Sequence, residues 1–119
     1  MLLGILLGCT PATDRIDPVA LAEGLKTRPS DFYIVDVRMS YEFNGGHLPG
    51  AHSMPYPGVM WNADDLAPKA GQTVVLVCLS GHRSRLPMNT IRTQFPNVTV
   101  VDLEGGMQAW RAQGRGVEW

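Results

Sequence analysis

The chain has 119 residues, a length that predicts one domain with a core of its own and argues against two domains. Apolar residues make up 45% and charged residues 18% of the chain, which excludes an intrinsically disordered protein. The net charge of −1 gives no indication of nucleic acid binding. The two cysteines, Cys9 and Cys78, are too few for a disulfide framework, and no residues at zinc-ligand spacing predict a metal site.

The first nine residues are mostly apolar and end at Cys9. A bilayer span takes about 20 residues, so this segment is too short for one, but it fits a shortened signal peptide. Leu6-Leu7-Gly8-Cys9 resembles a bacterial lipobox, whose cysteine is lipidated, although no Lys or Arg precedes it. The resemblance implies membrane attachment through Cys9, in the cell envelope or periplasm. The alternative is an apolar tail on a cytoplasmic protein. We therefore divide the chain into an N-terminal segment with a linker (1–15) and a domain (16–119).

The domain is expected to open with a helix and a strand. Asp17 is a good helix cap and Pro18 suits the first helical position. Arg28-Pro29 should end this helix, because the residue before a proline avoids the helical conformation. Phe32 to Val37 is an apolar run that predicts a strand buried on both faces.

Charged residues cluster at the end of this strand. Asp36 would lie level with Cys78 if the two strands that carry them are parallel. Arg38 and Glu42 are four residues apart in a predicted helical turn, which favours an ion pair between them. A solvated pair contributes under about 1 kcal/mol, so this spacing alone does not indicate a functional site.

The middle of the chain is expected to be irregular. His52 to Met54 predicts a short strand, and residues 55–71 form a long loop with three prolines. Loops of this length are often functional. Tyr56, Met60 and Trp61 could form one wall of a pocket over the second cysteine, or they could fill a small core under the loop.

A strand followed by a polar loop lies at 73–85. Thr73 to Val77 is a β-branched run typical of a buried strand, and Cys78 ends it. In open α/β sheets, ligands bind at this edge. Ser84 is the expected start of the next helix. The loop between the cysteine and this serine consists of Leu79, Ser80, Gly81, His82 and Arg83.

The composition of this loop predicts a reactive cysteine. Its backbone amides can form an anion-binding nest, and the following helix would point its positive end at the same place. His82, Arg83 and Arg85 add hydrogen-bond donors and positive charge. Because each of these features stabilises a thiolate, Cys78 should have a lowered pKa and act as a nucleophile. A buried structural cysteine is the alternative.

The last elements complete an α/β pattern. Val98 to Leu103 predicts another buried strand, Gly105-Gly106 allows a tight turn, and Met107 to Gln113 predicts a helix. Strands that alternate with short helices indicate a mostly parallel central sheet with helices on both faces.

Four stretches, taken together, resemble the signatures of the rhodanese family of sulfurtransferases. They are Ile34-Val35-Asp36-Val37-Arg38 with Tyr41-Glu42-Phe43, then Gly46-His47-Leu48-Pro49-Gly50-Ala51-His52, the loop Cys78 to Ser84, and Leu103-Glu104-Gly105-Gly106-Met107-Gln108-Ala109-Trp110. They cover the chain from about Ile16 to Gly114 and occur in the family's order. The resemblance implies a rhodanese-like fold in a single-domain version.

The resemblance also implies a mechanism and a set of site residues. The thiolate of Cys78 would take the outer sulfur of a donor such as thiosulfate, and cyanide or a thiol would then accept it from the persulfide. The amides of Leu79 to Ser84 would stabilise the persulfide, while His82 and Arg83 hold the anionic donor. Asp36 and Arg38 would support the loop. No cofactor is implied, the partners are small molecules, and a monomer is expected.

Two other functions remain open on the sequence. A cysteine phosphatase needs one more residue between its cysteine and arginine than the four that separate Cys78 from Arg83. The shorter loop favours a single sulfur atom over a phosphate group. A rhodanese-like module without catalysis, or a carrier that delivers sulfur to a protein partner, is the second alternative. Catalytically inactive members usually lack the cysteine that this chain retains.

Overall fold

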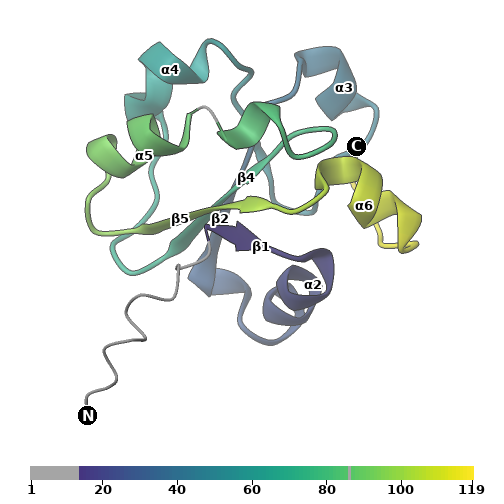
Figure 1. The fold of residues 1–119 in the computed structure, drawn as a ribbon. Helices are drawn as coiled ribbons and strands as arrows, with labels where there is room; N and C mark the ends of the chain where they lie inside the picture. Colours follow the sequence, from purple (N-terminus) through teal and green to yellow (C-terminus); the bar gives the residue numbers. More distant parts are fainter. Residues whose placement is uncertain (1–13, 86) are drawn as a thin grey trace.

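Five parallel strands form one sheet in the order β1-β5-β4-β2-β3 (Figure 1). The computed structural model describes residues 14–85 and 87–119, without the side chain of Arg85, so Cys9 and its predicted lipidation lie outside the described residues. The strands are β1 (Arg15–Ile16), β2 (Phe32–Asp36), β3 (His52–Ser53), β4 (Thr73–Val77) and β5 (Thr99–Leu103). The helices are α2 (Pro18–Thr27), α3 (Ser40–Asn44), α4 (Val59–Asn62), α5 (Met88–Gln94) and α6 (Gly106–Ala112).

Helices cover both faces of the sheet, as the sequence predicts (Figure 1). Side chains alternate along β4, so Val75 and Val77 face the helices α2 and α6 while Val74 and Leu76 face α4 and α5. Each face therefore has its own apolar core. Cys78 belongs to the core on the α4 and α5 side.

Local signals place several elements correctly. The side chain of Asp17 accepts hydrogen bonds from the backbone N–H groups of Val19 (2.8 Å) and Ala20 (3.0 Å), which caps α2 as predicted. The strand β4 has the predicted bounds, and β5 and α6 each begin within one residue of their predicted starts.

The sheet begins earlier than the predicted domain boundary. Arg15 was expected in the linker and Ile16 at the start of the domain, but the two residues form β1 and pair with Asp102 and Leu103 of β5. Two residues are too short to show the alternation by which a strand is recognised. Pairing with β5 therefore makes residues 15–16 a strand, and their own sequence does not predict it.

The segment 55–71 is more regular than its prolines suggest. It contains α4 and a 3₁₀ turn at Ala63–Asp65. Tyr56 packs against the core that includes Cys78, whereas Met60 is 39% and Trp61 68% exposed. Trp61 therefore fills no core under the segment. Within the described parts of the chain, no helix has both the length and the hydropathy that crossing a membrane requires.

Candidate active site

Cys78 lies directly after β4, the central strand of the sheet. The start of α6 fixes its backbone, because Met107 N donates to Cys78 O (2.8 Å) and Gln108 N donates to Leu79 O (2.9 Å). Gly106 makes this close approach feasible. It has a φ of +57°, and a Cβ there would lie 2.7 Å from the carbonyl carbon of Leu79.

The loop after Cys78 folds back over its sulfur. The backbone N–H of Gly81 donates to Cys78 Sγ at 2.9 Å, and the hydroxyl of Ser84 donates at 3.6 Å. The residue is 1% exposed. Burial raises the pKa of the Cys78 thiol, but hydrogen bonds from the Ser84 hydroxyl and from the N–H groups of Ser84, Gly81 and Ser80 outweigh it. The pKa is therefore lowered, as the sequence predicts.

Ser84 does not start a helix, which corrects the prediction. It lies in a 3₁₀ turn at Arg83–Arg85, and α5 begins only at Met88 with Pro87 as its cap. The reason is tertiary: the hydroxyl of Ser84 is buried between Cys78 Sγ and Asp102 Oδ2, which lies 3.3 Å away, so it caps no helix. The prediction that a helix starting at Ser84 would point its positive end at the Cys78 sulfur is therefore wrong, because α5 begins four residues later.

Asp102 is a part of the site that the sequence analysis missed. It is fully buried at the fourth position of β5, where it pairs with Leu76 of β4. Its Oδ2 lies 3.3 Å from the Ser84 hydroxyl, and Arg15 Nε lies 3.7 Å from its Oδ1. A charged residue in a strand that is expected to be buried is unusual, because such a charge is costly unless it is paired. That mismatch is the signal by which the sequence could have identified it.

Replacing Ser84 with alanine should raise the pKa of Cys78. The change removes a hydrogen bond that lowers the pKa of Cys78 by stabilising the thiolate, and hydrogen bonds to charged groups contribute roughly 1.5–3 kcal/mol. The thiolate would then form at higher pH than in the native chain. The ultraviolet absorbance of the thiolate, followed against pH in a Cys9→Ala background, measures this. An unchanged titration curve would mean that the backbone amides alone set the pKa.

Asp36 and Arg38 form a buried ion pair beside the loop. Arg38 Nη2 donates to Asp36 Oδ2 (2.7 Å) and to the backbone oxygen of Gly46 (2.8 Å), while Arg38 Nε donates to Asp36 Oδ1 (2.9 Å). The predicted pair between Arg38 and Glu42 is therefore wrong. Asp36 lies two residues before Arg38, at the buried end of β2. Both of its carboxylate oxygens accept hydrogen bonds from the Arg38 guanidinium, a charge-assisted geometry that outcompetes Glu42.

Replacing Arg38 with alanine should reduce the free energy of unfolding by about 3–5 kcal/mol, because Asp36 would be left buried without its cation. Urea unfolding measures this loss. Arg28→Ala is the matched control, since Arg28 and its partner Asp31 are both more than half exposed and their pair contributes under about 1 kcal/mol. Equal losses in the two variants would contradict a structural role for the buried pair.

Glu42 instead pairs with Arg83 in the cysteine loop. Arg83 Nη1 donates to Glu42 Oε1 (3.1 Å) and Arg83 Nη2 donates to Glu42 Oε2 (3.2 Å). Glu42 Oε1 also accepts from the backbone N–H of Met39 at 3.0 Å. The hydrogen bonds from Arg83 lower the pKa of Glu42, and Glu42 in turn raises the pKa of Arg83. The arginine predicted to hold a donor is therefore already engaged.

The remaining loop side chains form its outer rim. Ser80 Oγ lies 3.0 Å from His82 Nδ1, and Leu79 is 40% exposed. The structure thus places Gly81 and Ser84 of the predicted loop against the sulfur of Cys78 and the side chains of His82 and Arg83 away from it, against Ser80 and Glu42. Asp36 ends the neighbouring strand β2, and Arg38 follows two residues later. In residues 14–85 and 87–119 no three His, Cys, Asp or Glu side chains group as a metal site would need.

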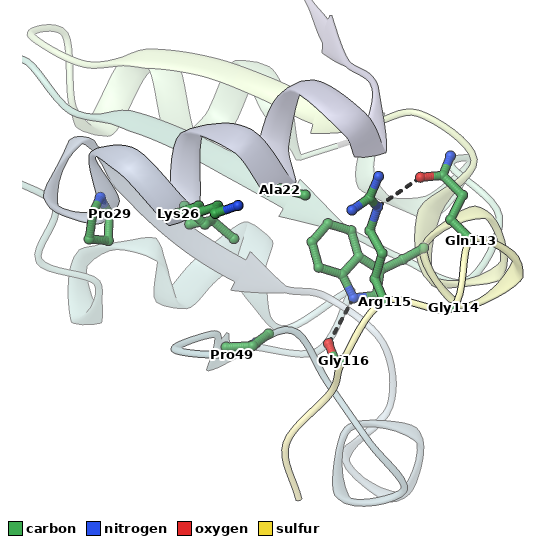
Figure 2. Close-up of a pocket in the computed structure, with 10 residues that line it drawn as sticks. Ala22, Lys26, Pro29, Pro49, Gln113, Gly114, Arg115 and Gly116 are labelled. Atoms are coloured by element: carbon green, nitrogen blue, oxygen red, sulfur yellow. Dashed lines mark hydrogen bonds between the residues drawn. The ribbon is translucent and has the colours of Figure 1, made fainter.

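A cavity of about 510 Å³ lies away from this loop, between α2 and the residues that follow α6 (Figure 2). Lys26, Trp110 and Arg115 are among its lining residues, and Trp110 Nε1 donates to Gly116 O at 3.0 Å. Trp110 belongs to the core on the opposite face of the sheet from Cys78. The cavity is therefore separate from the nucleophile, and the site is the loop itself.

The chain is similar in sequence to an uncharacterised protein and to proteins described as sulfurtransferases. An uncharacterised protein of Synechocystis is 36% identical over 81 residues, which are 68% of this chain and 44% of that protein. The adenylyltransferase and sulfurtransferase MOCS3 of Drosophila grimshawi is 29% identical over 119 aligned residues, covering 86% of this chain and 26% of that protein. The chain thus spans less than half the length of these relatives.

Solved structures of other proteins share the fold of this chain. A thiosulfate sulfurtransferase from Pseudomonas aeruginosa aligns with a TM-score of 0.76 and 27% identity, over 91% of this chain and 20% of that one. A rhodanese-like domain protein from Staphylococcus aureus aligns with a TM-score of 0.72 and 27% identity, over 89% and 97%. A protein of unknown function from Rhodopseudomonas palustris, described as a possible tyrosine phosphatase, aligns with a TM-score of 0.74 and 27% identity, over 89% and 85%.

The family model of the rhodanese-like domain matches residues 17–113, which contain the cysteine loop and the strands on either side of it. This match covers most of the chain, and it agrees with the parallel sheet and with the order of the four sequence stretches. The chain therefore belongs to the rhodanese-like domain family.

Proposed function

We propose that this protein is a sulfurtransferase that moves a sulfane sulfur from a donor to a thiophilic acceptor through a persulfide on Cys78. The observation that carries the proposal is the loop itself, in which the Gly81 N–H lies 2.9 Å from a buried cysteine sulfur with a lowered pKa. Relatives in the family include proteins described as sulfurtransferases. The donor belongs to the class of sulfane-sulfur compounds that includes thiosulfate and persulfides, and the acceptor is cyanide or a thiol.

The reaction consists of two displacements. The thiolate of Cys78 attacks the outer sulfur of the donor, and the bond between that sulfur and the rest of the donor breaks. The leaving group, sulfite for thiosulfate, departs with the bonding electrons. The acceptor then attacks the terminal sulfur of the persulfide and restores the thiolate. N–H groups of the loop stabilise the negative sulfur in both steps, so the protein needs no cofactor for this chemistry.

The size of the loop supports sulfur over phosphorus as the transferred atom. Four residues separate Cys78 from Arg83, and the amide of Gly81 already contacts the sulfur. A tetrahedral phosphate needs a wider ring of donors around it. Phosphatase activity is therefore the less favoured function.

Intact mass after incubation with a donor tests the proposal. The native chain should gain one sulfur atom from thiosulfate, mercaptopyruvate or a persulfide, and cyanide should remove it. The absence of any such gain with every donor would contradict the proposal. A persulfide that forms but passes to no small acceptor, and only to a protein cysteine, would instead identify a sulfur carrier. Hydrolysis of an aryl phosphate would identify a phosphatase.

The N-terminal segment is proposed to attach the protein to a membrane through lipidated Cys9, in the cell envelope. The support for this is the sequence Leu6-Leu7-Gly8-Cys9 alone. Expression of the natural gene should place the protein in the membrane fraction, and Cys9→Ala should release it while sulfur transfer is unchanged. A protein that remains in the soluble cytoplasmic fraction would contradict this. Loss of turnover in the Cys9→Ala variant would indicate a second redox cysteine.

A further inference from the structure

An ion pair joins helix α3 to the cysteine loop across 41 residues of sequence. Glu42 and Arg83 meet through two hydrogen bonds of 3.1 and 3.2 Å, with side chains 16% and 35% exposed. A paired geometry of this kind uses two of the nitrogen atoms with which arginine binds oxyanions. Arg83 is five positions after Cys78, so its charge would otherwise act on any anion that approaches the sulfur.

This pairing changes the electrostatics that a donor meets. A free guanidinium attracts a dianion such as thiosulfate, but a guanidinium paired with a carboxylate has no net charge and attracts it far less. To contact Arg83 directly, the anion would have to displace Glu42. The thiolate of Cys78 adds negative charge of its own to the same place. The loop is therefore poorly suited, as it stands, to a small dianionic donor.

The role of Glu42 exceeds that of a helix cap. Its Oε1 accepts from the backbone N–H of Met39 at the start of α3, and one oxygen is enough for that contact. Its second oxygen, Oε2, accepts from Arg83 Nη2. Glutamine would keep an oxygen for Met39 but would place an amide N–H₂ opposite Nη2, where it cannot accept. The substitution Glu42→Gln therefore separates charge from capping.

We propose that Glu42 is a specificity-determining residue, which masks the charge of Arg83 and directs the site toward persulfide donors without net negative charge and away from small dianions such as thiosulfate. The inference rests on the proposed function, since it names the donor class of the same loop. Removing the charge of Glu42 should make Arg83 available to anions. Adding the charge back, or removing Arg83 as well, should reverse the effect.

Two donors of different charge test this inference. In Glu42→Gln the KM for thiosulfate should fall by about ten-fold, the effect of restoring one positive charge near a dianion in a water-like dielectric. The KM for cysteamine persulfide, which carries an ammonium group and no net negative charge, should change less than two-fold. High ionic strength should reduce the gain for thiosulfate, because salt screens exposed charges.

Three further variants complete the test. Arg83→Gln combined with Glu42→Gln should lose the gain, since the effect depends on the freed guanidinium. Glu23→Gln in α2 is the matched control, because it removes the same charge from an exposed position without a contact to the loop. Glu42→Asp, which keeps the charge, should retain the preference of the native chain. Equal changes in KM for both donors, or a gain that persists without Arg83, would overturn the inference.

A binding measurement separates this inference from the proposed function. Sulfite, the dianion that leaves when thiosulfate donates, can be titrated into Cys78→Ser protein, which needs no turnover. Its affinity should be about ten-fold higher in Cys78→Ser with Glu42→Gln than in Cys78→Ser alone. Equal affinities would contradict the role of Glu42 even if the native chain transfers sulfur. A clear difference would support it even if no persulfide forms.

Discussion

Replacing Cys78 with serine is expected to abolish sulfur transfer while leaving the fold intact. Serine is close to cysteine in size, so the core on the α4 and α5 side should remain packed. Its hydroxyl is scarcely ionised at neutral pH, and it cannot form a persulfide. Intact mass should show no added sulfur with any donor, and thiosulfate:cyanide turnover should fall to background.

The control for this experiment is the chain's other cysteine. Cys9→Ala should still gain one sulfur atom, since the proposed nucleophile is Cys78 and the family match begins only at residue 17. The melting temperature of Cys78→Ser should lie close to that of the native chain, which shows that lost activity is not lost folding. Turnover that survives in Cys78→Ser would remove Cys78 from the mechanism.

Inserting one residue between Gly81 and His82 should also abolish sulfur transfer. The N–H of Gly81 contacts Cys78 Sγ at 2.9 Å, and a longer loop would no longer fold tightly over the sulfur. The insertion would also displace Arg83 from Glu42. The variant would have the spacing of a cysteine phosphatase, and slight hydrolysis of aryl phosphates is expected. Persulfide formation and phosphate release measure the two activities.

An insertion elsewhere serves as the matched control. One glycine after Gly114 lengthens the exposed turn that follows α6, where a Cβ would meet no atom within 4 Å. This turn lies on the α6 side of the sheet, away from Cys78, so the insertion should leave sulfur transfer unchanged. Full sulfurtransferase activity in the Gly81–His82 insertion variant would contradict the argument from loop size. Rapid aryl phosphate hydrolysis by the native chain would contradict it as well.

Local patterns in the sequence are enough to predict much of this fold. The β-branched run of β4 has the bounds that the structure assigns to it, and Asp17 caps α2. These features depend on residues within a few positions of each other, so burial pattern and capping chemistry reveal them. The cysteine after β4 is also predictable, because the carboxyl end of a parallel strand is the usual place for ligand binding.

The partners of the charged residues were decided by the tertiary structure. The sequence indicates that Arg38 and Glu42 lie on one helical turn, yet Arg38 pairs with Asp36 and Glu42 pairs with Arg83. Spacing along a helix describes which side chains are within reach of each other, but not which other groups compete for them. A buried carboxylate and a loop 41 residues away are stronger competitors here.

The sequence by itself determined where the main strands lie along the chain, the position of Cys78 and the short loop after it. Only the tertiary structure decided that Ser84 is buried between Cys78 and Asp102 instead of starting α5, and that Arg15 and Ile16 form an edge strand. The physical reason is the range of the interactions. Propensity and periodicity act between neighbours in the chain, whereas these contacts form only when β1, β4 and β5 lie side by side.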